Sequence, residues 1–200
     1  MAHVPAEVRR QQFIDAAVTV IAHEGVDGAT TRRIAEVAGA PLAALHYVFQ
    51  TKENLLWAVF EELAELLRAD FDNIEQHGRN LAAEARQLLL SMVAWGIKNP
   101  DYSRAQLEIW LWGERNDREI ASDAYTKFIG AWKDIFRGVR GSLPEDELES
   151  FTRVFTAIVD GLAMQFTTEA DPEATMRHAA MAADMIEAYL KRRRRHTASV

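Results

Sequence analysis

The sequence has no cysteine, few prolines and glycines, and no long apolar run. The lack of cysteine excludes disulfide bonds and thiolate metal sites in these 200 residues, and it is typical of a reducing compartment. The five prolines and ten glycines fall largely between segments with helical patterns. No apolar stretch approaches the roughly 20 residues of a transmembrane helix, and the first residues lack the apolar segment of a signal peptide. We therefore expect a cytoplasmic protein without a membrane partner.

Charge is distributed unevenly along the chain, whose formal net charge is −7. Residues 1–54 carry five basic and six acidic side chains, whereas residues 55–190 carry thirteen basic and twenty-four acidic ones. An acidic body is poorly suited to contact phosphate, so contact with nucleic acid is expected in the nearly neutral N-terminal part. The basic run at 191–196 is either a solvated tail or a segment that attracts phosphate without sequence specificity.

Apolar residues recur at helical spacing throughout, and alternation typical of strands is missing. Gly25 is expected to end a first helix, Thr30 or Thr31 to begin a second that ends at Gly39, and Thr51 to cap a fourth. The third lies at about 41–48. Longer helices are predicted at about 80–98, 102–114, 117–140, 145–168 and 173–194. These segments predict an all-α fold with a three-helix head (1–52), a larger helical bundle (53–195) and a tail (196–200).

The stretch "TTRRIAEVAGAPLAALHYVF" has the spacing of a helix-turn-helix. Gly39 can adopt the positive φ that a tight turn requires. Pro41 suits the first turn of the second helix, where a missing N–H costs nothing. The inner faces of the two helices are formed by Ile34, Ala35, Ala38, Leu45 and Phe49. Such a pair presents its second helix to the major groove of DNA.

Residues 9–60 resemble the N-terminal domain of the TetR family of transcriptional regulators. The resemblance rests on "FIDAAVTVIAHEGVDGATTRRIAEVAGA", on Leu45, Tyr47 and Phe49, and on the "KENL" that follows. The remaining helices are similar in length and layout to the family's ligand-binding and dimerising domain, and "LEIWLWGERNDREI" resembles the subgroup of the choline-responsive repressor BetI. The resemblance implies a repressor that binds a near-palindromic operator as a homodimer and is released by a small-molecule effector. No cofactor is implied.

The resemblance also indicates which residues contact DNA. Family members commonly carry polar residues where this chain has Pro41 to Ala44, so we expect base recognition through thymine methyl groups, assisted by His46. The alternatives are a buried helix face at 42–44 and a surface histidine without a role. Residues expected to contact DNA are Thr30, Thr31, Arg32, Arg33, Pro41, Leu42, Ala43, Ala44, His46, Tyr47 and Lys52.

Tryptophan is concentrated in the middle of the chain. Pockets in helical bundles are lined by aromatic side chains with few polar groups, although each such residue could equally belong to the core. Together with the resemblance, the pattern predicts an effector pocket, and an aromatic cage for a quaternary ammonium group is conceivable. The expected lining is Met92, Trp95, Glu108, Trp110, Trp112, Phe128 and Trp132.

The last two helices carry apolar stripes that are longer than an isolated core needs. Two such helices from each of two subunits would form a four-helix interface with two-fold symmetry. A dimer would place two recognition helices on one face of DNA. The residues expected at the interface are Phe155, Ile158, Val159, Leu162, Phe166, Met181, Met185 and Tyr189.

Two alternatives to a ligand-responsive repressor are a regulator of another kind and a helical-bundle enzyme. An activator, or a regulator without a small ligand, is compatible with the same sequence. A helical-bundle enzyme with a di-metal centre would need Glu-x-x-His pairs, and none of the six histidines has a glutamate three residues before it. Glycine loops that cradle phosphate are also missing. We therefore expect neither a catalytic site nor a metal site.

Overall fold

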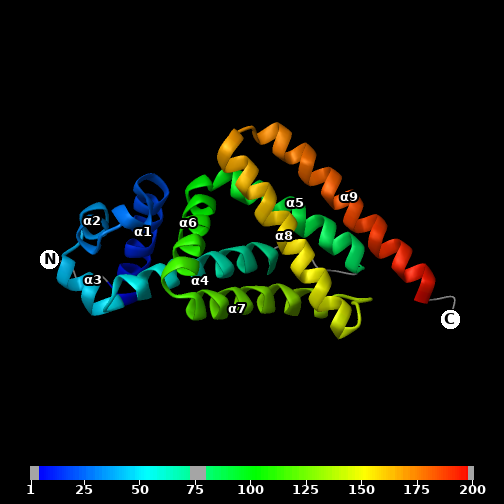
Figure 1. Ribbon diagram of the computed structural model, residues 1–200, viewed down its shortest axis with the longest axis horizontal. Coiled ribbons are helices and arrows are strands. Elements are labelled where there is room, and N and C mark those ends of the chain that lie inside the picture. Colours follow the sequence, from blue (N-terminus) through cyan, green and yellow to red (C-terminus); the bar gives the residue numbers. More distant parts are fainter. Residues whose placement is uncertain (1–4, 73–79, 198–200) are drawn as a thin grey trace. The chain divides into compact units, whose positions relative to one another are not determined.

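The computed structural model of the protein describes residues 5–72 and 80–197, with side chains throughout except at 63–72 and 194–197. Its helices confirm the predicted all-α fold (Figure 1). Within the described ranges, no helix is both long and apolar enough to cross a membrane. The helices are α1 (Ala6–Gly28), α2 (Thr31–Val37), α3 (Leu42–Phe49), α4 (Lys52–Asp72), α5 (Leu81–Lys98), α6 (Pro100–Asn116), α7 (Arg118–Arg137), α8 (Glu145–Glu169) and α9 (Pro172–Thr197).

The chain divides into two compact units, and the expected domain boundary after residue 52 stays a prediction. The first unit is Met1–Glu65 with Pro100–Ala124, and the second is Leu66–Asn99 with Tyr125–Val200. Helix α6 therefore belongs with α1, α2 and α3, because it packs against α1. Helices α4 and α7 each run from one unit into the other. Helix α6 is placed in the first unit by its contacts with α1, which is distant in sequence. Local sequence patterns do not predict contacts of this kind.

In the first unit, α6 packs against α1 and also lies close to Trp57 of α4 and Ala121 of α7. The Tyr102 hydroxyl donates a hydrogen bond to Asp15 Oδ1 at 3.1 Å. Burial, followed by the Asp15 charge, raises the pKa of Tyr102 and keeps it a donor. Gly113 of α6 is buried, and a Cβ there would lie 2.9 Å from the Trp57 ring and 3.1 Å from Ala121. Only glycine permits this close packing of α6 against α4 and α7.

The second unit is held together by α5, α8 and α9 on one side and by an aromatic cluster between α7 and α8 on the other. Helices α5, α8 and α9 share a cluster of buried apolar residues, which contains Val93, Leu162 and Ala179. The ring of Phe136 on α7 lies 5.1 Å from that of Phe151 and 5.0 Å from that of Phe155, with both pairs edge to face. These contacts link α5, α7, α8 and α9 within the second unit.

Asp160 is a half-buried acid on α8 in this unit. Burial raises its pKa from 3.8 to about 6, because a charged carboxylate loses hydration there. Its charge also contributes to the raised pKa of Tyr125 on α7, after the larger effect of burial. The carboxylate is therefore a source of pH-dependent stability.

Replacing Asp160 by asparagine is expected to stabilise the protein at pH 7 by on the order of 2 kcal/mol. With a folded pKa of about 6, the folded chain keeps a proton that the unfolded chain releases above about pH 4. Stability of the natural protein therefore falls as pH rises between these values and stays lower above them. Urea unfolding between pH 4 and 8, at one protein concentration, should show this slope flattened in Asp160→Asn. Exposed Asp123→Asn is the control, and parallel curves for all three proteins would contradict the assignment.

Candidate nucleic-acid interface

Helix α2 begins as its sequence predicts. The Thr30 side chain accepts a hydrogen bond from the backbone N–H of Arg33 at 3.2 Å, so Thr30, and not Thr31, is the N-cap. Ile34 and Ala35 are buried, which confirms the inner face expected for this helix. Thr31 and Arg32 follow the cap and lie half-buried and exposed, respectively.

The turn between α2 and α3 has the glycine and proline geometry expected of it, with one difference. Gly39 has a φ of +59°, which a residue with a Cβ rarely adopts. Pro41 lies one residue before α3 as its N-cap, with φ −62° and ψ 137°, and not in the first helical turn as predicted. The carbonyl of Pro41 accepts a hydrogen bond from the N–H of Ala44 at 2.9 Å. Pro41 therefore begins α3, and its missing N–H leaves no backbone donor unpaired at this position.

Helix α3 turns one side into the first unit and the other to solvent. Leu45 is 0% exposed and Phe49 is 6% exposed, and the Phe49 ring lies 6.3 Å from that of Phe13, edge to face. Tyr47, by contrast, is 86% exposed. We use the term recognition face for the remaining side of α3, formed by Leu42, Ala43, Ala44, His46 and Tyr47.

The recognition face is not part of the core. Ala43 and His46 are exposed, and Leu42 and Ala44 are half-buried. A buried helix face at 42–44, the alternative weighed from the sequence, therefore does not describe these residues. Because α3 is anchored through the buried Leu45 and Phe49, the exposed Ala43, His46 and Tyr47 are not needed to hold it in the first unit.

Two of the basic residues expected to contact DNA already have partners within the chain. Arg33 donates from Nε to Glu24 Oε1 at 2.9 Å and also pairs with Glu36, and the hydrogen bond to Glu24 is the main cause of its raised pKa. Lys52 Nζ donates to the carbonyl of Val26 at 2.5 Å. An ammonium has three donors, so Lys52 keeps two for a phosphate. Arg33, in contrast, is committed to two carboxylates, which makes the exposed Arg32 the better candidate of the two.

The junction between α3 and α4 contains an unusual backbone conformation. Gln50 follows α3 with a φ of +65°, a region that favours glycine. The next residue, Thr51, accepts the N–H of Asn54 at 3.1 Å and so caps α4 as predicted. The junction therefore combines a favourable cap with a strained residue.

Replacing Gln50 by glycine is expected to stabilise the protein by about 1 kcal/mol. Glycine adopts this φ without the steric cost that a Cβ imposes. The gain should appear as a higher urea midpoint with an unchanged slope. Gln11→Gly, inside α1, is the matched control and should destabilise by a similar amount. Equal losses for both variants would show that Gln50 is not strained.

The residues expected to line an effector pocket are divided between the two units. Glu108, Trp110 and Trp112 lie on α6 in the first unit, and Glu108 approaches the kink of α1 at Gly25. In the second unit, the buried rings of Phe128 and Trp132 on α7 are 5.9 Å apart, edge to face. The remaining two, Met92 (buried) and Trp95 (half-buried), both lie on α5.

The residues expected at a dimer interface separate into two groups by burial. Phe155, Leu162 and Phe166 are buried within the single chain. For these three the expectation is corrected, since a side chain enclosed by its own chain offers almost no surface to a second copy. Ile158 and Val159 are half-buried. The exposed members are Met181, Met185 and Tyr189, which recur every four residues along α9.

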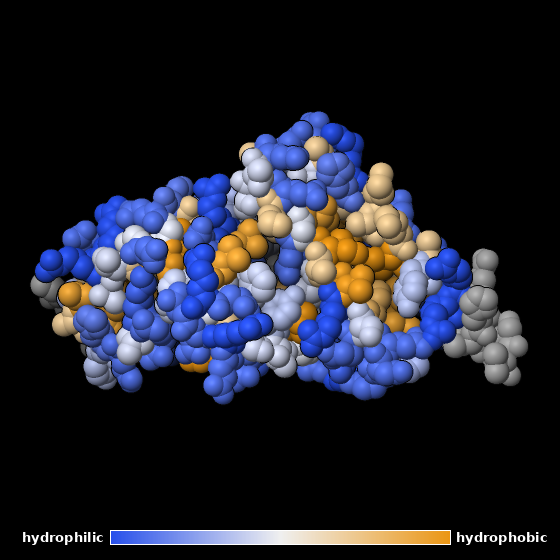
Figure 2. Space-filling view, in the orientation of Figure 1, coloured by the Kyte–Doolittle hydropathy of each residue, from blue (hydrophilic) through white to orange (hydrophobic). Residues whose placement is uncertain are grey.

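Exposed apolar residues also occur on α8 next to its buried side. Val154 and Met164 are both largely exposed, and between them lies Gly161, where an added Cβ would meet no neighbouring atom within 4 Å. Neither residue was among those expected at an interface, although Val154 lies at helical spacing between Phe151 and Ile158. Figure 2 shows apolar side chains gathered over the part of the second unit where α8 and α9 lie.

Comparisons with known proteins agree with the all-α fold and its N-terminal helix-turn-helix. Residues 13–59 match the family model described as "Bacterial regulatory proteins, tetR family". The chain is 31% identical over 191 residues to the HTH-type nicotine-responsive transcriptional repressor HdnoR of Paenarthrobacter nicotinovorans, covering 92% of this chain and 95% of that protein. It is 25% identical to the regulator BetI of Rhizobium meliloti (strain 1021), covering 92% and 90% of the two chains. A transcriptional regulator from Rhodococcus sp. Rha1 has a similar structure, with a TM-score of 0.73, 19% identity, and coverage of 88% of this chain and 95% of that one.

Proposed function

The chain belongs to the TetR family of bacterial transcriptional regulators, and from that premise we propose that it is a repressor that binds a near-palindromic operator as a homodimer and is released by a small-molecule effector. The relatives named above are transcriptional regulators, and HdnoR, which is 31% identical to this chain, is described as a repressor.

The observation that carries the proposal is the separation of roles on α3. Leu45 and Phe49 anchor the helix, whereas Ala43, His46 and Tyr47 of the recognition face are exposed. Arg32 on α2 and Lys52 at the start of α4 are basic residues close in sequence to either end of α3. Side chains that contact phosphate fix the position of a protein on the duplex, and those that contact base edges give specificity. We assign the first role to Arg32, Tyr47 and Lys52.

Base recognition is assigned to the apolar part of the recognition face. Leu42, Ala43 and Ala44 have no hydrogen-bonding side chain, and apolar contact is the way in which such residues distinguish the methyl group of thymine. His46, which is exposed on the same helix, supplies a hydrogen bond to a base or phosphate.

Four residues of the expected set remain. Thr30 and Pro41 act in this proposal by capping α2 and α3 and not by contacting bases. Arg33 is paired with Glu24 and Glu36, and the half-buried Thr31 is given no separate role.

Replacing the central thymines of the operator by uracil is expected to weaken binding by about tenfold for each contacted methyl group, the lower end of the cost of losing a good base contact. The operator would first be located by footprinting on DNA upstream of the protein's own gene. Gel shifts with the substituted duplexes then give the loss for each position. If every central thymine can be replaced without loss, the recognition face does not use methyl contacts.

Regulation is assigned to a ligand that favours one spacing of the two heads of the dimer. Helices α4 and α7 run between the units, so a change in the second unit can be transmitted along continuous helices. Only unequal affinity of the effector for the two spacings is needed. The repressor HdnoR is described as nicotine-responsive, and nicotine is therefore the first compound to test.

One titration tests the regulatory part of the proposal. DNA upstream of the gene is mixed with the protein in a gel shift, with and without nicotine and related amines. Quenching of tryptophan fluorescence in the same samples reports whether the compound binds at all. Release of DNA together with quenching supports an effector. Quenching without release would mean that the bound compound does not regulate DNA binding.

A further inference from the structure

Helix α1 bends at Gly25, the residue at which the sequence predicts its end, and one further turn follows. Gly25 has a φ of 72° and a ψ of 171°, a combination that is essentially restricted to glycine. We call residues 25–29 the terminal turn of α1. Val26 and Ala29 in this turn have buried side chains. The backbone of the terminal turn is therefore held by the bend at one end and by buried side chains along its length.

The terminal turn holds the side chain of Lys52 through a backbone carbonyl. The carbonyl of Val26 accepts a hydrogen bond from Lys52 Nζ at 2.5 Å and another from the N–H of Ala29 at 3.2 Å. Carbonyl groups at the C-terminal end of a helix carry a partial negative charge, which favours a lysine ammonium group beside them. Because Lys52 is the first residue of α4, this contact joins the end of α1 to the start of α4.

An ammonium group that is held in the free protein is better prepared for DNA than a mobile one. A lysine side chain loses much of its conformational freedom when it contacts a phosphate, and this loss opposes binding. The contact with Val26 restricts the half-buried Lys52 before DNA arrives. Since an ammonium group has three N–H donors, two remain for the phosphate. The entropic cost of the DNA contact is thereby met largely during folding.

We propose that Gly25 is a positioning residue for operator binding, because its bend turns the carbonyl of Val26 toward Lys52 and so orients the ammonium group for a phosphate. This role rests on the proposed function, in which Lys52 contacts the DNA backbone. The opposite reading is that the carbonyl withdraws Lys52 from DNA. The two readings predict opposite signs, since loss of the bend weakens operator binding in the first and strengthens it in the second.

Replacing Gly25 by alanine is expected to weaken operator binding by about tenfold, because a lysine in each head of the dimer must then be ordered on binding. A Cβ at this position would have Glu108 Oε2 as its nearest contact, at 3.9 Å, so the substitution acts on the backbone conformation and not through crowding. Gly130→Ala is the matched control. An added Cβ there meets nothing within 4 Å, and Gly130 lies on α7 in the second unit, so operator affinity should not change.

A double-mutant cycle with Lys52→Gln shows whether Gly25 acts through Lys52. Gly25→Ala should then have little further effect in a protein that already carries Lys52→Gln. Equal losses in both backgrounds, or tighter binding by Gly25→Ala, would overturn the proposal. The salt dependence of operator affinity tests its premise, because Lys52→Gln should lower the slope by about one for each head. An unchanged slope would reject the phosphate contact of the proposed function and this positioning role together, whereas a lower slope without coupling would reject the positioning role alone.

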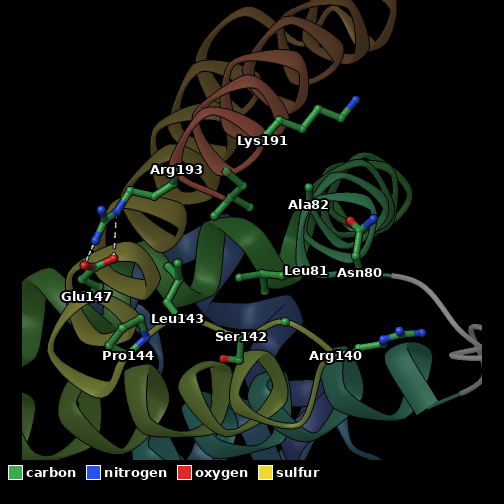
Figure 3. Close-up of a pocket in the computed structure, with 12 residues that line it drawn as sticks. Asn80, Leu81, Ala82, Arg140, Ser142, Leu143, Pro144, Glu147, Lys191 and Arg193 are labelled. Carbon is green, nitrogen blue, oxygen red and sulfur yellow. Dashed lines mark hydrogen bonds and ion pairs between the residues drawn. The ribbon is translucent and has the colours of Figure 1, made fainter. Parts of the chain in front are cut away.

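NMR of the lysine ammonium groups in the free natural protein needs no variant, so it decides the matter even if Gly25→Ala fails to fold. The ammonium group of Lys52 should show restricted motion and slow hydrogen exchange, because it is bonded to a fixed carbonyl. Lys191 is the comparison, since its exposed side chain extends from α9 and pairs with Glu187 of the same helix (Figure 3). Equal mobility of the two ammonium groups would contradict the proposal.

Discussion

Replacing Met185 by arginine is expected to convert the protein to a monomer and to lower its operator affinity by at least about 100-fold. Met185 is 67% exposed on α9, between Met181 and Tyr189, and all three belong to one exposed apolar stripe. A stripe of this kind is typical of a surface that a second copy covers. In the proposed dimer, an arginine at this position would put a charge on the apolar stripe of each copy, which disfavours its burial against the other copy.

The loss of DNA affinity follows from the loss of the dimer. Two linked heads bind two half-sites with an effective concentration that a single head lacks, which typically contributes a factor of 10²–10⁴. Sedimentation velocity measures the first effect, and a gel shift measures the second. Ile120→Arg places the same charge on another exposed apolar residue, at the start of α7, and should change neither. A Met185→Arg protein that remains dimeric would remove α9 from the interface.

The residues expected at a dimer interface show where sequence patterns stop being sufficient. Phe155, Leu162 and Phe166 share the apolar stripe of α8 that suggested an interface, yet the same chain covers them with α5, α7 and α9. Periodicity identifies which side of a helix is apolar, but not which element covers that side. Only the burial of each residue in the folded chain separates Phe155 in the core from Met185 on the surface.

Features decided by neighbouring residues were predictable, and features decided by distant ones were not. The caps at Thr30 and Thr51 and the turn at Gly39 depend on a few adjacent residues, and the structure confirms them. The pairing of Arg33 with Glu24 joins α2 to α1, and the burial of Asp160 arises from the packing of the second unit. Neither has a signature in the sequence around it. The sequence therefore suggested a set of candidate DNA-contact residues. It did not predict which of the two arginines in that set is paired with carboxylates of the same chain.

Replacing Ala43 by glutamate is expected to reduce operator affinity by about 100-fold or more while leaving the fold intact, because placing like charges opposite each other at an interface costs several kcal/mol. Ala43 is exposed on the recognition face, so a longer side chain has room in the free protein. In the complex the new carboxylate would face the negatively charged DNA at the centre of the proposed contact. Glutamate is also a good helix former, so α3 should persist.

The matched control for this variant is Val8→Glu, which adds the same charge to an exposed position on α1. Both variants make the net charge of the chain more negative by one, so any general repulsion from DNA affects them equally. The difference between their operator affinities therefore measures the local effect at α3. Unfolding curves that match those of the natural protein would show that the head is intact. An equal, small loss for both variants would mean that α3 does not face DNA, and the recognition face would have to be sought elsewhere in the first unit.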